Sequence, residues 1–412
     1  MKKGFSIIGV ICIIIVIGLA VFAVLVNRGI IKMNKKLEEQ KPNLVNVYTE
    51  KETNNDIKNN NENNNTVNIY DDESNNKDPL IGQNEGDEQN KLNEKINFVY
   101  SLEDVIQKDT SWCGSFNLVW NMLKNDLAKK DIIFDNMTKT IENLNKGTFN
   151  EDQLDEDSYY STYGFKTKKL KSDIEKAIKE KFNETSDILD NFTFTDDSEE
   201  YFLYTMLKKE FKFKYAFDEL DNGDFGNYKD VKFFGIDKNT DDKIRNQVKV
   251  LYYNGKDHFA VKLNTKTNDE VLLVKGHKGI TFYDIYNYML KENIAYEGNE
   301  YFGDNDTLKV PNLKMDEIKE VKEVENKSFY FADGSVWQID KALQTIKFEL
   351  DKTGGKIKSE AAMSLRDTAV MIDEPEEIRN FEIDNDFVIF LKEKDAGYPY
   401  FAAYISDITK FQ

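Results

Sequence analysis

The feature that most constrains the fold of this chain is a strand, a long loop and a second strand near its C-terminus. Apolar and polar residues alternate over 345–350, as they do in a β-strand with one buried face. The loop at 352–377 repeats this alternation over 359–366, and the chain then returns through an apolar segment at 387–391. Side chains in a strand point alternately to its two faces, so part of the loop has the pattern of a strand that a sheet could accept.

This layout resembles the serpin family. In serpins, a loop of small residues lies between a central strand and a C-terminal hairpin, and it enters the sheet as an added strand after a protease cuts it. The resemblance implies a hinge followed by a bait region. The hinge residues are Gly354, Ser359, Glu360, Ala361 and Ala362. The bait residues are Thr368, Ala369, Val370, Met371, Ile372 and Asp373. An alternative for the same segment is a short helix over 359–371, with Ser359 as its N-cap.

Other segments resemble serpin elements in the family's order. They are a helix at 174–189, a strand and turn at 202–218, a hairpin at 248–263 with a two-residue Asn254-Gly255 turn, a proline-bearing strand at 309–315 and a closing hairpin at 387–403. The resemblance therefore predicts an α+β fold, with serpin-like mixed β-sheets and helices packed on them.

Four residues depart from the family's pattern. Thr205 replaces the asparagine usual in the central strand, and Phe213 replaces the tryptophan usual near the point where the loop enters. Met363 and Leu365 are larger than the alanines usual in the loop. Overpacking typically costs about 1–3 kcal/mol, so we expect crowded insertion and only a modest rise in melting temperature after cleavage.

The N-terminus predicts a membrane anchor. Residues 5–26 are an uncharged apolar run, about 33 Å long as a helix, which is enough to cross the roughly 30 Å hydrocarbon core. A short basic region, 1–4, precedes this run, which we interpret as an uncleaved single-pass transmembrane helix, with a cleaved signal peptide as the alternative. Residues 27–94 are rich in asparagine and predict a disordered stalk. The globular domain is then 95–412, expected on the extracytoplasmic side of the cell membrane.

Composition argues against several ligand classes. The formal net charge of −19 argues against nucleic acid. The sequence has no phosphate-binding glycine loop and no Cys/His cluster of the metal-binding type, so we expect neither cofactor nor metal. Of the two cysteines, only Cys113 lies outside the apolar N-terminal run, which leaves no cysteine pair for a disulfide within the domain.

Cys113 supports a competing hypothesis. It precedes a segment whose apolar residues recur at helical spacing, and a thiol at a helix N-terminus has a lowered pKa. These apolar residues are Phe116, Val119, Trp120, Leu123 and Leu127. His258 follows Cys113 by 145 residues, a spacing that resembles papain-like thiol proteases, with Asn264 as a possible orienting residue. The structural alternative is that Cys113 is a small, buried residue of the core with an unreactive thiol.

The sequence thus favours a protein that is not an enzyme. The prediction is a membrane-anchored serpin-like protein that inhibits an extracellular serine-type protease through its exposed loop and contacts the membrane through 5–26. The alternative within the same fold is a non-inhibitory binding or structural surface protein. The alternative outside it is a papain-like cysteine peptidase that uses Cys113 and His258.

Overall fold

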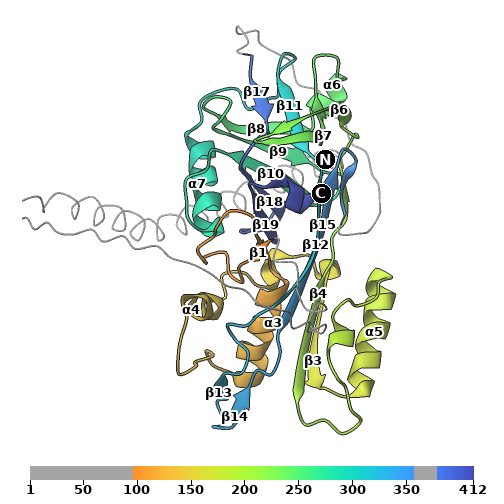
Figure 1. The fold of residues 1–412 in the computed structure, drawn as a ribbon, viewed down its shortest axis with the longest axis vertical. Helices are drawn as coiled ribbons and strands as arrows, with labels where there is room; N and C mark the ends of the chain where they lie inside the picture. The colour runs from red at the N-terminus through yellow and green to blue at the C-terminus, as the bar shows by residue number, and fades with distance from the viewer. Residues whose placement is uncertain (1–95, 357–377) are drawn as a thin grey trace, which may run out of the picture. The chain divides into compact units, whose positions relative to one another are not determined.

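The computed structural model describes residues 96–356 and 378–412. Over these two ranges the chain forms an α+β fold of several β-sheets with α-helices packed against them (Figure 1). Both ranges belong to one compact unit, Glu85–Gln412. No helix within them is long and apolar enough to cross a membrane. The predicted anchor, 5–26, and stalk, 27–94, lie outside the described residues.

The largest sheet has seven strands, in the order β1-β2-β19-β18-β10-β9-β8. The strands are β1 (Asn97–Phe98), β2 (Thr110–Cys113), β8 (Val248–Tyr253), β9 (Phe259–Asn264), β10 (Asp269–Lys275), β18 (Phe387–Glu393) and β19 (Phe401–Ile405). Strands β10 and β18 are buried along their whole length. Helix α7 (Phe282–Ala295) begins after Thr281, whose hydroxyl accepts a hydrogen bond from the Asp284 amide, and it packs Phe282 and Tyr286 against Phe390 of β18.

A second sheet has four strands, in the order β17-β11-β7-β6. The strands are β6 (Asp218–Phe225), β7 (Tyr228–Ile236), β11 (Thr307–Pro311) and β17 (Asn380–Glu382). Aromatic contacts join it to the seven-stranded sheet, with ring centroids 6.1 Å apart for Phe225 and Phe387 and 5.2 Å apart for Phe381 and Phe259. Short helix α6 (Asp242–Arg245) follows β7.

The remaining strands form three smaller groups. Strands β12 (Leu313–Glu320), β15 (Leu343–Asp351), β16 (Gly354–Lys356) and β5 (Phe211–Lys212) form a sheet in the order β12-β15-β16-β5. Strands β3 (Tyr159–Phe165) and β4 (Tyr201–Leu207) pair with each other, as do β13 (Ser328–Tyr330) and β14 (Val336–Gln338). Figure 1 shows the β3–β4 pair and the β12–β15 pair diverging from each other.

Helices cover both faces of the β3–β4 pair. On one face, α5 (Lys168–Phe182) packs Ile174 and Ile178 against Phe202 and Tyr204. On the other lies α3 (Ser115–Met122), which continues as a π-helix (Leu123–Ala128) and is followed by α4 (Lys139–Lys146). Single turns of 3-10 helix complete the described elements at Glu151–Gln153, Glu156–Ser158, Leu189–Asn191 and Ile408–Phe411.

Several expectations for local structure are confirmed. In β15 the apolar residues Ile346, Phe348 and Leu350 are buried, whereas the residues between them are exposed or half-buried. The predicted hairpins at 248–263 and 387–403 are the pairs β8–β9 and β18–β19. The α+β class is likewise what the structure shows.

Three boundaries were wrong. The helix expected over 174–189 ends at Phe182, because Asn183 adopts the left-handed conformation. Five residues, 254–258, connect β8 to β9 instead of a two-residue turn. The strand expected over 309–315 is divided between β11, which ends at Pro311, and β12, which begins at Leu313.

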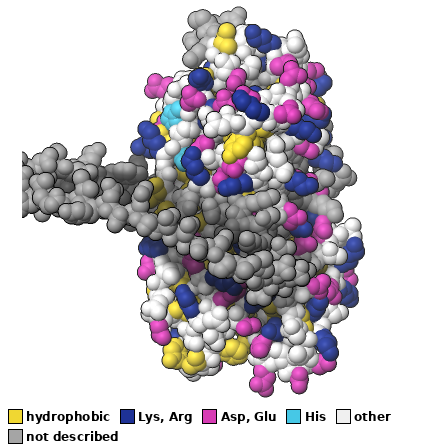
Figure 2. Space-filling model, in the orientation of Figure 1, with side chains coloured by type: hydrophobic (Ala, Val, Ile, Leu, Met, Phe, Trp, Pro, Cys, Tyr) yellow, Lys and Arg dark blue, Asp and Glu magenta, His cyan; other side chains and the backbone are white. Residues whose placement is uncertain are grey.

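The molecular surface carries charges of both signs. On the face seen in Figure 2, acidic and basic side chains are interspersed rather than gathered by sign. Although the net charge of the chain is −19, the part of this face that is not grey offers no broad single-sign patch for electrostatic steering.

Candidate functional site

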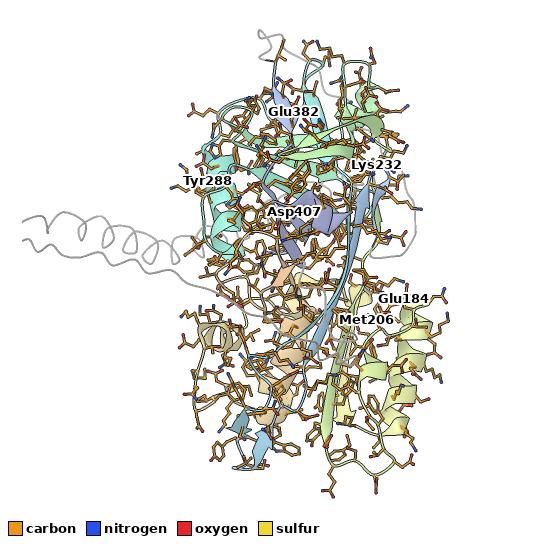
Figure 3. All side chains as sticks on the ribbon, in the orientation of Figure 1. Glu184, Met206, Lys232, Tyr288, Glu382 and Asp407 are labelled. Atoms are coloured by element: carbon orange, nitrogen blue, oxygen red, sulfur yellow. The ribbon has the colours of Figure 1, made fainter. Side chains whose placement is uncertain are left out.

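Strands β4 and β15 line the same two cavities from opposite sides, and in the described residues they are not paired with each other. β15 is bonded to β12 along its whole length, but on its other side only residues 349–351 are bonded, to β16. β4 is bonded to β3 along its whole length, and none of the strands in the described ranges pairs with its other edge. We call the space between 201–207 of β4 and 343–348 of β15 the interstrand gap. Figure 3 marks Met206 on the β4 side of this gap and Glu184 just beyond α5.

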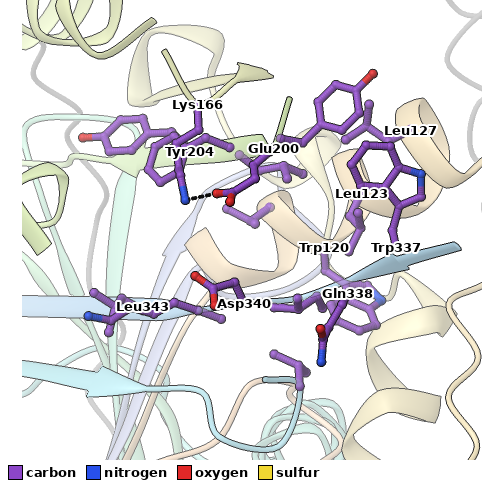
Figure 4. A pocket seen from close by; sticks show the side chains of 18 of the residues that line it. Trp120, Leu123, Leu127, Lys166, Glu200, Tyr204, Trp337, Gln338, Asp340 and Leu343 are labelled. Carbon is purple, nitrogen blue, oxygen red and sulfur yellow. Dashed lines mark ion pairs between the residues drawn. The ribbon is translucent and has the colours of Figure 1, made fainter. Parts of the chain in front are cut away.

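Two cavities lie along the interstrand gap. The larger, about 210 Å³, lies between β4, residues 338–343, α3 with its π-helix, and the β13–β14 hairpin (Figure 4). The smaller, about 100 Å³, is lined by 204–207, 343–347 and residues of α3. Protein interiors rarely contain voids larger than a water molecule, so two cavities in line with a missing strand indicate space that another segment or ligand can occupy.

Strand β16 occupies the first positions of the gap. Gly354 pairs with Asp351 on one side and with Lys212 on the other. Gly355 pairs in the same way with Leu350 and Phe211, antiparallel to both neighbours. β16 runs antiparallel to β15, so its C-terminal end, at Lys356, points toward the gap.

The two glycines are required by this close approach. Gly354 has φ of +149°, and a Cβ there would lie 2.2 Å from the carbonyl oxygen of Phe211. At Gly355 a Cβ would lie 2.4 Å from the ring of the same phenylalanine. Only glycine fits without displacing β5, which gives Gly354, predicted as a hinge residue, a physical role. The other hinge residues, Ser359 to Ala362, and the bait residues, Thr368 to Asp373, lie outside the described residues.

The floor of the gap holds a buried polar side chain, Gln344 of β15. Its Nε2 donates to the carbonyl of Cys113 at 2.9 Å and to the hydroxyl of Ser115 at 3.1 Å. Its Oε1 is buried and has no partner among the described residues. Thr205, which lines the same cavity from β4, shares its hydroxyl with Ser161 of β3 at 2.9 Å. The hydroxyl of Thr205 therefore joins β4 to β3, and among the described residues it makes no hydrogen bond across the gap.

The segment after α5 bridges the outer side of the gap. Asp187 and Lys347 approach to 3.3 Å, and Lys341 donates to the carbonyl of Asn191 at 3.3 Å. Asp187 and Lys347 are about half exposed, so their ion pair contributes little to stability. Breaking these two contacts should therefore cost little free energy.

A buried ionic cluster lies where the chain passes from β4 to β5. The ammonium group of Lys209 lies 2.5 Å from Glu393 and 3.1 Å from Asp269, and Tyr400 donates to Asp269 at 3.1 Å. All three charged side chains are less than 10% exposed. Burial raises the pKa of Glu393, against the opposing effect of its hydrogen bond from Lys209. Asp269 belongs to β10 and Glu393 to β18, so the cluster ties the chain between β4 and β5 to these two strands.

Two other residues hold the ends of the loop region. Phe213, the other departure from the serpin pattern, is buried among aromatic rings, and its amide donates to the carbonyl of Thr353 at 3.0 Å. After the loop, buried Arg379 donates to Asp306 at 2.6 Å and to the carbonyls of Asn299 and Tyr301. The described chain therefore leaves one sheet at β16 and returns in another at β17.

Sequence reasoning missed the gap and the ionic cluster. The gap follows from pairings that β4 and β15 do not make, which no local pattern records. One signal was available, since Gln344 interrupts the apolar face formed by Ile346 and Phe348. Lys209 carried no comparable signal, because its partner Glu393 lies 184 residues away.

The structure does not bring Cys113 and His258 together. They lie on β2 and next to β9, four strand steps apart in the seven-stranded sheet, so roughly 19 Å separates the two strands. Cys113 ends β2 directly before Gly114, the N-cap of α3, but burial raises the pKa of its thiol, whereas a nucleophile needs a lower pKa. Asn264 donates to the carbonyl of Gln247 at 3.1 Å. These residues therefore do not form a papain-like site.

Comparison with known proteins gives a distant likeness. No protein-family model and no curated protein matches the sequence. Among solved structures, Serpin48 of the insect Tenebrio molitor matches with 14% identity and a TM-score of 0.29, covering 49% of this chain and 54% of its own. The chain resembles the serpins. A serpin of the trematode Schistosoma haematobium matches with 12% identity and a TM-score of 0.33, covering 57% and 62%.

The same search also finds thyroxine-binding globulin in complex with thyroxine, at 13% identity and a TM-score of 0.36, covering 58% of this chain and 64% of that protein. Each of these matches spans less than two thirds of the solved protein's own length. The neighbours agree with the serpin-like resemblance predicted from the sequence.

Proposed function

We propose that this protein is a serpin-like inhibitor of an extracellular serine-type protease and not an enzyme. The observation that carries the proposal is β16, which pairs on both sides at the start of a gap that has room for one antiparallel strand. In the proposed mechanism, the protease's serine attacks a carbonyl within Thr368–Asp373 and forms an ester as the peptide bond breaks. The freed loop then follows β16 into the gap before water can release the protease.

The register of β16 supports this proposal. Continued without a bulge, it places Ala361 between Gln344 and Thr205, and it places Met363 beside Leu203. Paired residues of an antiparallel sheet point to the same face, and Gln344 faces the floor of the gap. Ser359, Ala361, Met363 and Leu365 would all face inward. This is the same set that the alternation in the sequence places on one side.

Insertion should stabilise the protein. Each added backbone hydrogen bond contributes a net of about 0.5–1.5 kcal/mol, and an inserted strand bonds to both β4 and β15. It would also remove two free strand edges, which folded proteins otherwise protect. The cleaved form should therefore melt at a higher temperature than the intact form.

The experiment combines a covalent trap with a melt. The purified protein is incubated with serine-type proteases of different specificity, and adducts that survive denaturing electrophoresis are mapped by mass spectrometry. We expect an adduct attached within Thr368–Asp373 and a higher melting temperature once the loop is cut. Cleavage in this segment without any rise in melting temperature would refute insertion. A rise without an adduct would leave a serpin-like protein that does not inhibit the proteases tested.

We further propose that residues 5–26 anchor the protein and that 27–94 hold the domain outside the cell membrane. The uncharged apolar run of the sequence supports the anchor. Deletion of 1–26 should release the protein from membranes that retain the full chain at alkaline pH. Resistance of the domain to protease added to intact cells would contradict the extracytoplasmic orientation.

A further inference from the structure

The larger cavity of the interstrand gap has walls built from aromatic rings. Tyr201 of β4 and Trp337 of β14 contact each other in its wall, with ring centroids 5.0 Å apart, and Trp337 stacks on Phe331 at 5.2 Å. Trp120 of α3 forms another wall, and Figure 4 shows its indole and that of Trp337 beside the cavity. Leu203 and Trp337 are only half-buried although they belong to this apolar wall.

Both lysines that line the cavity already have partners, and the lining carboxylate Asp340 is exposed, so that water screens its charge from a bound cation. Lys166 forms an ion pair with Glu200, drawn in Figure 4. Lys341 donates to the carbonyl of Asn191 at 3.3 Å, and its ammonium group lies 5.6 Å from the ring centroid of Phe192. A charged ligand would lose its hydration in this cavity and gain no unpaired counter-charge from these lysines. The lining therefore selects for an uncharged molecule.

We propose that this cavity is a binding site for a small, uncharged molecule with one or two aromatic rings. Its volume of about 210 Å³ lies below the range of about 300–1,000 Å³ typical of drug-sized ligands. It exceeds the roughly 150 Å³ of an engineered apolar cavity that binds benzene. Offset stacking on Trp337 and Tyr201 would favour a planar ring over an aliphatic chain of equal size. The site exists in the intact protein, and its binding does not depend on inhibition of a protease.

One consequence of the site does rest on the proposed function. The continued register of β16 places Met363 beside Leu203, which lines this cavity. A bound ligand and an inserted loop would then compete for the same volume. Ligand binding should slow insertion, and insertion should expel the ligand.

The three tryptophans of the chain can serve as spectroscopic probes of ligand binding. Trp120 and Trp337 line the cavity, whereas Trp112 is fully buried in another cluster, where it contacts Phe149. The full chain, labelled with 5-fluorotryptophan and held in lipid nanodiscs, is titrated with naphthalene and followed by fluorine NMR. We expect saturable shifts of the Trp120 and Trp337 resonances and no shift of Trp112. Unchanged resonances, or equal shifts of all three, would overturn the site.

Variants make the assignment specific. Leu203→Phe reduces the cavity and should weaken naphthalene binding at least tenfold, as should Ala342→Leu if the first variant is unstable. Leu290→Phe, on the exposed side of α7, is the matched control and should bind like the wild type. Naphthalene-2-sulfonate should bind at least tenfold more weakly than naphthalene. Equal binding of the two probes would contradict the selection for an uncharged ligand.

A final arm separates this inference from the proposed function. After a verified cut within 366–375, naphthalene should no longer shift Trp120 and Trp337, because the loop has taken the cavity. Binding that persists after the cut would leave the ligand site intact and contradict insertion. Absence of binding to the intact protein, together with a higher melting temperature after the cut, would refute the ligand site and leave insertion standing.

Discussion

Replacement of Met363 and Leu365 by alanine tests whether the loop fills the larger cavity. The sequence alone predicted crowding, in which case the double substitution should relieve strain and raise the melting temperature of the cut form. The structure leads to the opposite sign. A cavity of about 210 Å³ lies where the continued register of β16 places the two side chains, so they have room and their removal leaves that room empty.

The magnitude follows from the cavity volume. A residual cavity costs about 24 cal/mol per Å³, so reopening the whole 210 Å³ would cost up to about 5 kcal/mol in the cut form. For a domain of this size, that corresponds to a melting temperature lower by on the order of 10 °C than that of the cut wild type. The intact form should change little, because in the proposed mechanism the loop enters the cavity only after the cut.

Differential scanning calorimetry of four samples decides the matter: wild type and double variant, each intact and cut within 366–375. Ser364→Ala, at an outward-facing position of the same register, is the matched control and should change stability by less than about 0.5 kcal/mol. A cut double variant that melts at or above the cut wild type would refute the cavity argument and restore the crowding argument.

Four further outcomes are expected. Gly355→Ala should destabilise the protein by at least about 1 kcal/mol in urea unfolding, because its Cβ would overlap the Phe211 ring; an unchanged midpoint would contradict the pairing of β16 with β5. Lys209→Met should cost about 3–5 kcal/mol, because it leaves two buried carboxylates unpaired. Because the pKa of Glu393 is raised in the folded protein, its protonated form favours folding. This contribution to stability is complete below the ordinary pKa of a glutamate and is lost as the pH rises through the raised pKa. Glu393→Gln should remove this pH dependence of urea unfolding. Cys113 should react with a thiol reagent only after unfolding, and rapid labelling of the native protein would contradict its burial.

Local patterns predicted the parts of the fold that depend on near neighbours. β15 was predictable because a strand with one buried face alternates apolar and polar residues. β18 and β19 were predictable because a strand buried on both faces is a continuous apolar run. The helical spacing of α3 was visible in the same way, and the helix begins at Ser115, two residues after Cys113. Helical spacing marks the apolar face, but Cys113 is held in β2 by its pairing with Phe401, almost 300 residues away.

The candidate site was only partly predictable, because it depends on contacts distant in sequence. The loop's alternation and Gly354 pointed to a strand that enters a sheet, whereas the gap itself arises between β4 and β15, which are joined by no local pattern. Phe213 was noted as a departure from the family, yet its role is visible only in its bond to Thr353, 140 residues further along the chain.

In the proposed mechanism, the attachment of the chain at β17 explains why insertion would need a cut. Strand β17 is three residues long and pairs with β11 on one side, which by itself would be a weak attachment. Arg379, immediately before it, makes a buried ion pair with Asp306 and donates to two backbone carbonyls. To detach β17 would leave Asp306 buried without its partner, at a cost of about 3–5 kcal/mol. Cleavage between β16 and Arg379 avoids this cost, because the segment that follows β16 can then enter the gap while β17 remains in its sheet.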